Sequence, residues 1–189
     1  MQIKDFDITK FTGRNRRLLY EWQKLEYACQ NRDFKIEIID TNPFGLPTSY
    51  LVVYNIHSIC GVTNIDRLNQ AGVVNEPIFA DSFSMRIDLP ENYPCVDGSP
   101  QFRFLTTDAI GNAIEHPWHP NIRWAGSFAG RVCVNMSDTY TDLVWGIERV
   151  AGYLRYECYH ALPEPPYPED QSVAAWVIRQ AEPNGWIPF

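Results

Sequence analysis

Two neighbouring stretches decide how the rest of the chain is interpreted: His116-Pro117-Trp118-His119-Pro120-Asn121, and then Gly130-Arg131-Val132-Cys133-Val134-Asn135-Met136. The prolines, glycines and Asn before Cys133 favour an irregular loop, because proline restricts the backbone and Asn bonds to local backbone groups. A thiol held near the surface by such a loop is a candidate for covalent acyl chemistry, since the thiolate is a strong nucleophile. The alternative is that Cys133 is one more small buried hydrophobic residue.

Further landmarks stand on either side of these stretches. Upstream are Tyr93-Pro94, Pro100 and the strand-like run Phe102–Thr106, and downstream is the turn Pro166–Asp170. In this order they resemble the Tyr-Pro, His-Pro-Asn, Gly-x-x-Cys and Pro-x-Pro-Asp-Asp motifs of ubiquitin-conjugating enzymes. The resemblance covers roughly residues 14 to 180.

The resemblance implies an α/β fold of the α+β type, called UBC-like. It consists of an N-terminal helix, a four-stranded antiparallel meander sheet, an active-site loop and C-terminal helices. It also implies an activity: Cys133 would accept a ubiquitin-like protein as a thioester from an activating enzyme and pass it to an amine of a target protein. The implied partners are these three proteins, with no cofactor and no metal.

Roles for three more residues follow from the same resemblance. Asn121 would either donate a hydrogen bond to the developing oxyanion or brace the loop. Asp170, or less favourably Glu169, would orient the incoming lysine and help to remove its proton, although Asp170 is also a candidate helix cap. His119 is a structural loop residue in the family, but it is the catalytic base that a cysteine hydrolase would need.

The sequence also departs from the common pattern. Asn121 stands 12 positions before Cys133, a longer gap than in the commonest members, and Asn135 and Tyr140 replace a frequent Asp and Trp. These differences make the chain look most like the ubiquitin-conjugating enzymes of bacterial ubiquitin-like operons, several of which act in defence against phage. Two alternatives remain: a non-catalytic UBC-like module that only binds proteins, and a cysteine hydrolase that uses Cys133 and His119.

Composition limits the possibilities further. The chain has 189 residues, of which 45% are hydrophobic, enough for one sizeable core. We expect residues 14–189 to form a single domain, preceded by an extension over residues 1–13. The net charge of −7 argues against nucleic acid and anionic membranes as partners. Because no signal-like or 18-residue apolar run occurs, we expect a cytoplasmic protein.

The five cysteines stand far apart, without a Cys-x-x-Cys pair, so neither a disulfide framework nor a zinc finger is predicted. His116 and His119 are separated by Pro117 and would not share a helical face, which disfavours a metal site. No phosphate-binding glycine loop occurs, so a separate ATP-using enzyme would have to load the carrier.

Hydrophobic periodicity predicts the elements. An amphipathic helix spans about residues 15–30, with Leu18, Leu19, Trp22, Leu25 and Cys29 on one face. Arg14, Arg16, Arg17 and Lys24 concentrate positive charge near it. Such a run is commonly a solvated face, whereas the resemblance implies the docking site for the activating enzyme. Residues 1–13 would add a strand or lie across the core.

Strands are predicted at 34–38, 50–54, 83–89 and 102–105, with one covered face. A long connection at 58–80 contains a possible short helix at 65–70. After Cys133, a helix capped by Thr141 or Asp142 presents Leu143 through Cys158 and ends at the prolines of residues 163–168. A last helix covers about 170–180, and the apolar tail either docks on the core or awaits a partner.

Overall fold

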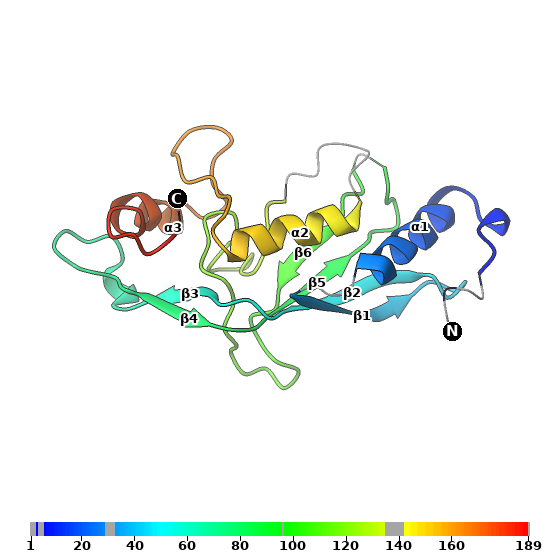
Figure 1. Ribbon diagram of the computed structural model, residues 1–189, viewed down its shortest axis with the longest axis horizontal. Helices are drawn as coiled ribbons and strands as arrows, with labels where there is room; N and C mark the ends of the chain where they lie inside the picture. Colours follow the sequence, from blue (N-terminus) through cyan, green and yellow to red (C-terminus); the bar gives the residue numbers. More distant parts are fainter. Residues whose placement is uncertain (1–2, 4–5, 29–32, 96, 135–141, 189) are drawn as a thin grey trace.

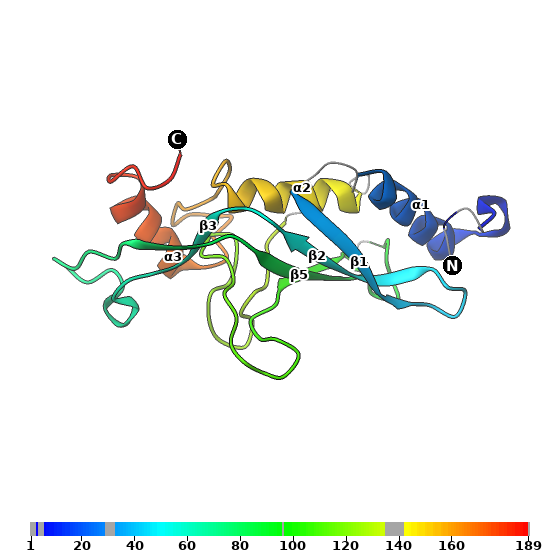
Figure 2. The ribbon, with the colours of Figure 1, turned by 60° about the horizontal axis from the view of Figure 1, so that its bottom comes forward.

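The computed structural model describes residue 3 and residues 6–28, 33–95, 97–134 and 142–188. Its main layer is a four-stranded antiparallel sheet of strand order β1-β2-β5-β6. Two helices, α1 and α2, cover one face of this sheet (Figure 1). They remain on that side when the molecule is turned (Figure 2). The predicted succession of helix, meander sheet and C-terminal helices is confirmed.

Helix α1 (Gly13–Ala28) is amphipathic as predicted. Leu18, Leu19, Trp22 and Leu25 are buried, and the other faces are exposed; Cys29 lies outside the described residues. The pattern did not predict that Glu21, on the same helix, is completely buried.

The sheet consists of β1 (Phe34–Thr41), β2 (Pro47–Tyr54), β5 (Phe83–Asp88) and β6 (Gln101–Phe104). Alternation determines the two faces: Met85 and Ile87 lie in the core, whereas Arg86 between them is exposed. This is the period of two that a half-covered sheet requires.

Residues 58–80 form a second, two-stranded sheet of β3 (Ser58–Val62) and β4 (Pro77–Ala80). The long connection was predicted, but these strands were not. All five residues of β3 are buried, so the strand lacks the alternation that would have indicated it. The predicted short helix is only the 3-10 turn η3 (Ile65–Arg67).

Helix α2 (Leu143–Leu154) begins at Asp142, whose side chain accepts a hydrogen bond from the Trp145 N–H. Thr141, the other predicted cap, lies outside the described residues. The predicted end of the helix is wrong, because α2 stops before Cys158 and the proline cluster. Tyr156 adopts a left-handed conformation (φ 56°) and, with Glu157, satisfies the last helical carbonyls.

The last helix is α3 (Gln171–Trp176), capped by Asp170 and continued by the π-helical turn η4 (Val177–Ala181). It packs against the 58–80 hairpin, at the opposite end of the molecule from α1 (Figure 1). The Trp176 indole N–H donates to the Asn75 carbonyl at 2.9 Å. Ile187 is buried and Trp186 stacks on Trp176, so the tail docks on this second core.

Before α1, Phe6 packs on Trp22 with ring centroids 5.4 Å apart. A 3-10 turn, η2 (Ile8–Lys10), follows. Residues 1–13 were expected either to add a strand or to lie across the core. In the described residues of this segment, packing against the core is observed. None of the described helices is long and apolar enough to cross a membrane.

Candidate active site

Cys133 lies on the surface between two buried valines, Val132 and Val134. Its N–H donates to the Asn121 carbonyl at 2.9 Å. Its own carbonyl accepts a hydrogen bond from the Tyr153 hydroxyl at 3.1 Å. The backbone at Cys133 is therefore held on both sides, and the thiol side chain faces outward.

Gly130, three residues earlier, is required by the close approach of two backbones. Its carbonyl accepts from the Phe104 N–H at 2.8 Å, and its φ is 81°. A Cβ built at this position would lie 2.1 Å from the Phe104 carbonyl oxygen. Only glycine fits such a contact without separating the loop from β6.

His119 is almost completely buried, with 1% of its surface exposed. Its ring stacks on Tyr153 with centroids 4.8 Å apart, and its Nδ1 accepts from the Asn121 N–H at 3.1 Å. Burial lowers the pKa of His119 to about 3. The imidazole is thus neutral at physiological pH and acts as packing beneath the loop. This geometry favours the structural role over that of a base.

Asn121 is half-buried, and its side-chain oxygen accepts from the His160 N–H at 3.1 Å. Because a backbone N–H can only donate, this contact assigns the oxygen end of the amide. The Nδ2 end is then the group with hydrogens to offer to another acceptor. Both predicted roles, loop brace and oxyanion donor, are compatible with this arrangement.

Asp170 is buried, and both of its carboxylate oxygens are used. One accepts from the Ser172 and Val173 N–H groups, which caps α3, and the other accepts from the Trp124 N–H at 2.9 Å. Its own N–H donates to the Pro120 carbonyl. Asp170 therefore joins the last helix to the loop that carries Asn121.

Glu169, the residue before Asp170, forms ion pairs with two arginines of the loop between Asn121 and Cys133. Its carboxylate lies 2.7 Å from Arg131 and 3.4 Å from Arg123. Only 13% of its side chain is exposed. The predicted acidic turn thus binds the loop before Cys133 at two adjacent positions, Glu169 and Asp170.

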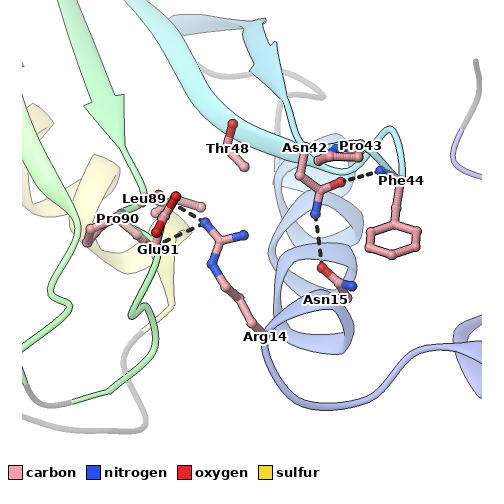
Figure 3. A pocket seen from close by; sticks show the side chains of 9 residues that line it. All are labelled: Arg14, Asn15, Asn42, Pro43, Phe44, Thr48, Leu89, Pro90 and Glu91. Carbon is pink, nitrogen blue, oxygen red and sulfur yellow. Dashed lines mark hydrogen bonds between the residues drawn. The ribbon is translucent and has the colours of Figure 1, made fainter.

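The four predicted partner-binding cations differ in how far they are exposed and in whether they contact other residues of the fold. Arg14 donates to the carbonyls of Leu89 and Pro90, each at 3.2 Å. It lines an open pocket, as do Asn42 and Phe44 of the turn between β1 and β2 (Figure 3).

Arg17 is 2.5 Å from buried Glu21, with 22% of its side chain exposed. Lys24 is 3.5 Å from Asp142 and Arg16 is exposed. Two of the four cations, Arg16 and Lys24, therefore point outward, whereas Arg14 and Arg17 also take part in packing.

Two residues of this region were not predicted from the sequence. Tyr153 contacts both motifs, through its hydroxyl at Cys133 and its ring at His119. Buried Glu21 accepts from the Tyr93 hydroxyl at 2.6 Å and from the Leu143 N–H at 2.9 Å. An acidic residue on the apolar face of a helix was the signal available for Glu21. No local pattern distinguishes Tyr153 from its neighbours.

The sequence matches no model of a known protein family and no curated protein. Solved structures do match. A putative ubiquitin-conjugating enzyme from Trypanosoma cruzi aligns with a TM-score of 0.50 and 12% identity, covering 93% of this chain and 96% of that one. H. polymorpha ubiquitin-conjugating enzyme Pex4p, solved with the soluble domain of Pex22p, aligns with a TM-score of 0.50 and 14% identity. This alignment covers 93% of this chain and 92% of that one. The chain therefore has the UBC-like α+β fold.

Proposed function

We propose that this protein carries a ubiquitin-like protein as a thioester on Cys133. The observation that supports the proposal is the exposed thiol, whose backbone is held by Asn121 and Tyr153, on a UBC-like fold. The Cys133 sulfur would attack the activated C-terminal carbonyl of the modifier and displace the group of the activating enzyme that held it, while the thiol proton passes to the leaving group or to solvent. A target amine would then attack the thioester and form the amide, while the thiolate leaves and the amine proton passes to solvent or a base.

The surrounding residues receive roles in this proposal. The Asn121 Nδ2 group would donate to the oxyanion that forms when the amine attacks, an interaction worth roughly 3–4 kcal/mol in other enzymes. Asp170 would keep Asn121 in position through the Pro120 and Trp124 contacts, and any effect on the lysine would add to that. Arg16 and Lys24 on α1 would contact the activating enzyme.

The proposed setting is a conjugation system with its own activating enzyme, modifier and target. A bacterial antiphage system remains the prediction from the sequence departures. The binding-module alternative would make Cys133 dispensable. The hydrolase alternative lacks an accessible base in His119, because that ring is buried and its lowered pKa makes it a weak base.

A loading experiment tests the proposal. The protein is incubated with the activating enzyme, ATP and modifier, and the products are separated with and without thiol. We expect a band that shifts by the mass of the modifier, disappears with thiol and is absent in Cys133→Ala. Cys133→Ser should give a thiol-stable ester. No adduct with a demonstrably active activating enzyme would favour the binding module.

A further inference from the structure

Three arginines lie side by side across the exposed face of the sheet. Arg86 of β5 is directly opposite Arg103 of β6, and Arg103 is opposite Arg131 in an antiparallel bridge. All three are exposed. Directly opposed residues present their side chains on the same face, about 5 Å apart, and like charges in this position are destabilising. We refer to Arg86, Arg103 and Arg131 as the arginine row.

The row ends beside the candidate nucleophile. Along residues 131–134, Arg131 and Cys133 are exposed, whereas Val132 and Val134 are buried. Alternation of this kind places Arg131 and Cys133 on one face, about 7 Å apart along an extended backbone. A side chain of a target protein that binds at the row would therefore lie two or three residues along the target chain from a lysine whose amine reaches the thiol.

The long loop before Cys133 arranges two members of the row. The Arg103 guanidinium donates to the Ser127 carbonyl at 3.0 Å. The Arg131 guanidinium lies over the Phe128 ring, 4.5 Å from its centroid. Both contacts fall in the loop between Asn121 and Cys133, so residues of this loop position the arginines beside the thiol.

Charge in this region is incompletely balanced. Asp88 pairs with Arg86 at 2.9 Å, and the single carboxylate of Glu169 serves both Arg131 and Arg123. Arg103 has no carboxylate partner among the described residues. Four guanidinium groups thus face two carboxylates, and the excess is positive in a protein whose net charge is −7.

We propose that the arginine row binds an acidic segment of the target protein, so that amines with Asp or Glu nearby are preferred. This proposal rests on the proposed function and specifies its substrate class. An acidic peptide fits better than nucleic acid, because an excess of about two charges over this small area gives no extended positive field. Carboxylates also match the planar donor geometry of guanidinium groups.

The test needs no activating enzyme. Two peptides carry a central cysteine as its 2-pyridyl disulfide, one flanked by two glutamates on each side and the other by glutamines. Attack by Cys133 forms a mixed disulfide and releases 2-thiopyridone, and mass spectrometry quantifies the adduct at Cys133. Rates are divided by those with 2-mercaptoethanol, which corrects for intrinsic reactivity. The net charge of the protein alone predicts that the acidic probe is slower.

We expect the acidic probe to react at Cys133 about threefold faster than the glutamine probe at low salt, and the preference to fade at high salt. Arg103→Gln should remove most of the preference, whereas Arg103→Lys should retain most of it. Arg67→Gln, which removes an exposed charge on the hairpin, is the matched control. Thermal melts establish that each variant is folded.

Equal or slower reaction of the acidic probe with the wild type overturns the inference. A preference that survives Arg103→Gln also does so, because the attraction would then come from elsewhere. Failure of the proposed function is separate, since it would appear as an absent thioester in the loading experiment while the probe preference remained. If loading succeeds, Arg103→Gln should slow discharge to a glutamate-flanked lysine peptide more than discharge to free lysine.

Discussion

The hydroxyl of Tyr153 lies 3.1 Å from the carbonyl oxygen of Cys133, while the ring of the same tyrosine stacks on His119. One side chain from α2 therefore holds both sequence motifs of the candidate site. Tyr153→Phe keeps the stacked ring and removes only the hydrogen bond. We expect it to lower the free energy of unfolding by about 1 kcal/mol. Tyr153→Ala should cost about 3–5 kcal/mol.

Urea unfolding measures both effects. Tyr27→Phe is the matched control. It removes the same hydroxyl from a side chain that is 82% exposed and lies outside the core. If Tyr153→Phe were as stable as Tyr27→Phe, the hydrogen bond to Cys133 would contribute nothing to the fold.

Alanine substitutions at Gly130 and Gly126 separate two costs: that of crowding the close backbone contact with Phe104, and that of a left-handed backbone conformation. Their φ values are 81° and 83°, but a Cβ at Gly126 meets nothing within 4 Å. Gly126→Ala should cost only the strain of a left-handed residue, about 1–2 kcal/mol. Gly130→Ala should cost at least about 3 kcal/mol, because the new methyl group would overlap the Phe104 carbonyl. Similar losses in urea unfolding would contradict the close approach.

Acid should destabilise the protein through His119. Burial lowers its pKa to about 3 in the folded state, whereas the unfolded value is near 6.5. Between these values the unfolded chain binds a proton that the folded one does not, so stability falls as the pH drops below about 6.5. At pH 5 the loss from this residue is about 2 kcal/mol relative to neutral pH.

Urea unfolding from pH 7.5 to 5 tests this dependence. His119→Gln should be less stable throughout and should show a flatter pH profile, although buried His116, whose pKa burial also lowers, retains part of the slope. A wild-type stability that rises toward pH 5 would contradict a buried neutral imidazole.

The structural contacts of Asp170 can be separated from an effect on the target amine. Asp170→Ala should lower stability by about 2–3 kcal/mol, since it removes the α3 cap and leaves the part-buried Trp124 N–H unpaired. Asp170→Asn retains an accepting oxygen and should cost less. If Asp170 only supports the loop, the Asn variant will load and discharge at nearly the wild-type rate.

If Asp170 also orients the target amine, Asp170→Asn will load normally but discharge to lysine several-fold more slowly. Single-turnover discharge of purified thioester separates these outcomes. Asp66→Asn, at an exposed carboxylate on the hairpin, is the control. Equal stability of Asp170→Ala and the wild type would contradict the capping role.

Much of the fold was predictable because its elements are half-buried. The 3.6-residue period identified α1 and α2, and strict alternation identified β5. The same reasoning missed β3, whose side chains are buried on both faces of the strand, and it misplaced the end of α2. That end depends on Tyr156, whose unusual conformation is compensated by burial and by a hydrogen bond to the Trp118 carbonyl.

For the site, motif order selected Cys133, Asn121 and Asp170, and the structure joins their backbones through the loop between them. Sequence reasoning could not find the link from Tyr153 to Cys133, because it depends on how α2 packs over the loop. Nor could it find the arginine row, since cross-strand neighbours are determined by register.

The second core links two segments that are far apart in the chain. The 58–80 hairpin shields Trp176, and the last helix and tail in turn shield the hairpin. Trp118 and Tyr156 also belong to this core, and the hairpin and the last helix are joined directly by the hydrogen bond from Trp176 to Asn75. Deletion of the hairpin should therefore also destabilise the last helix and the tail, although these segments lie about 100 residues apart in the chain.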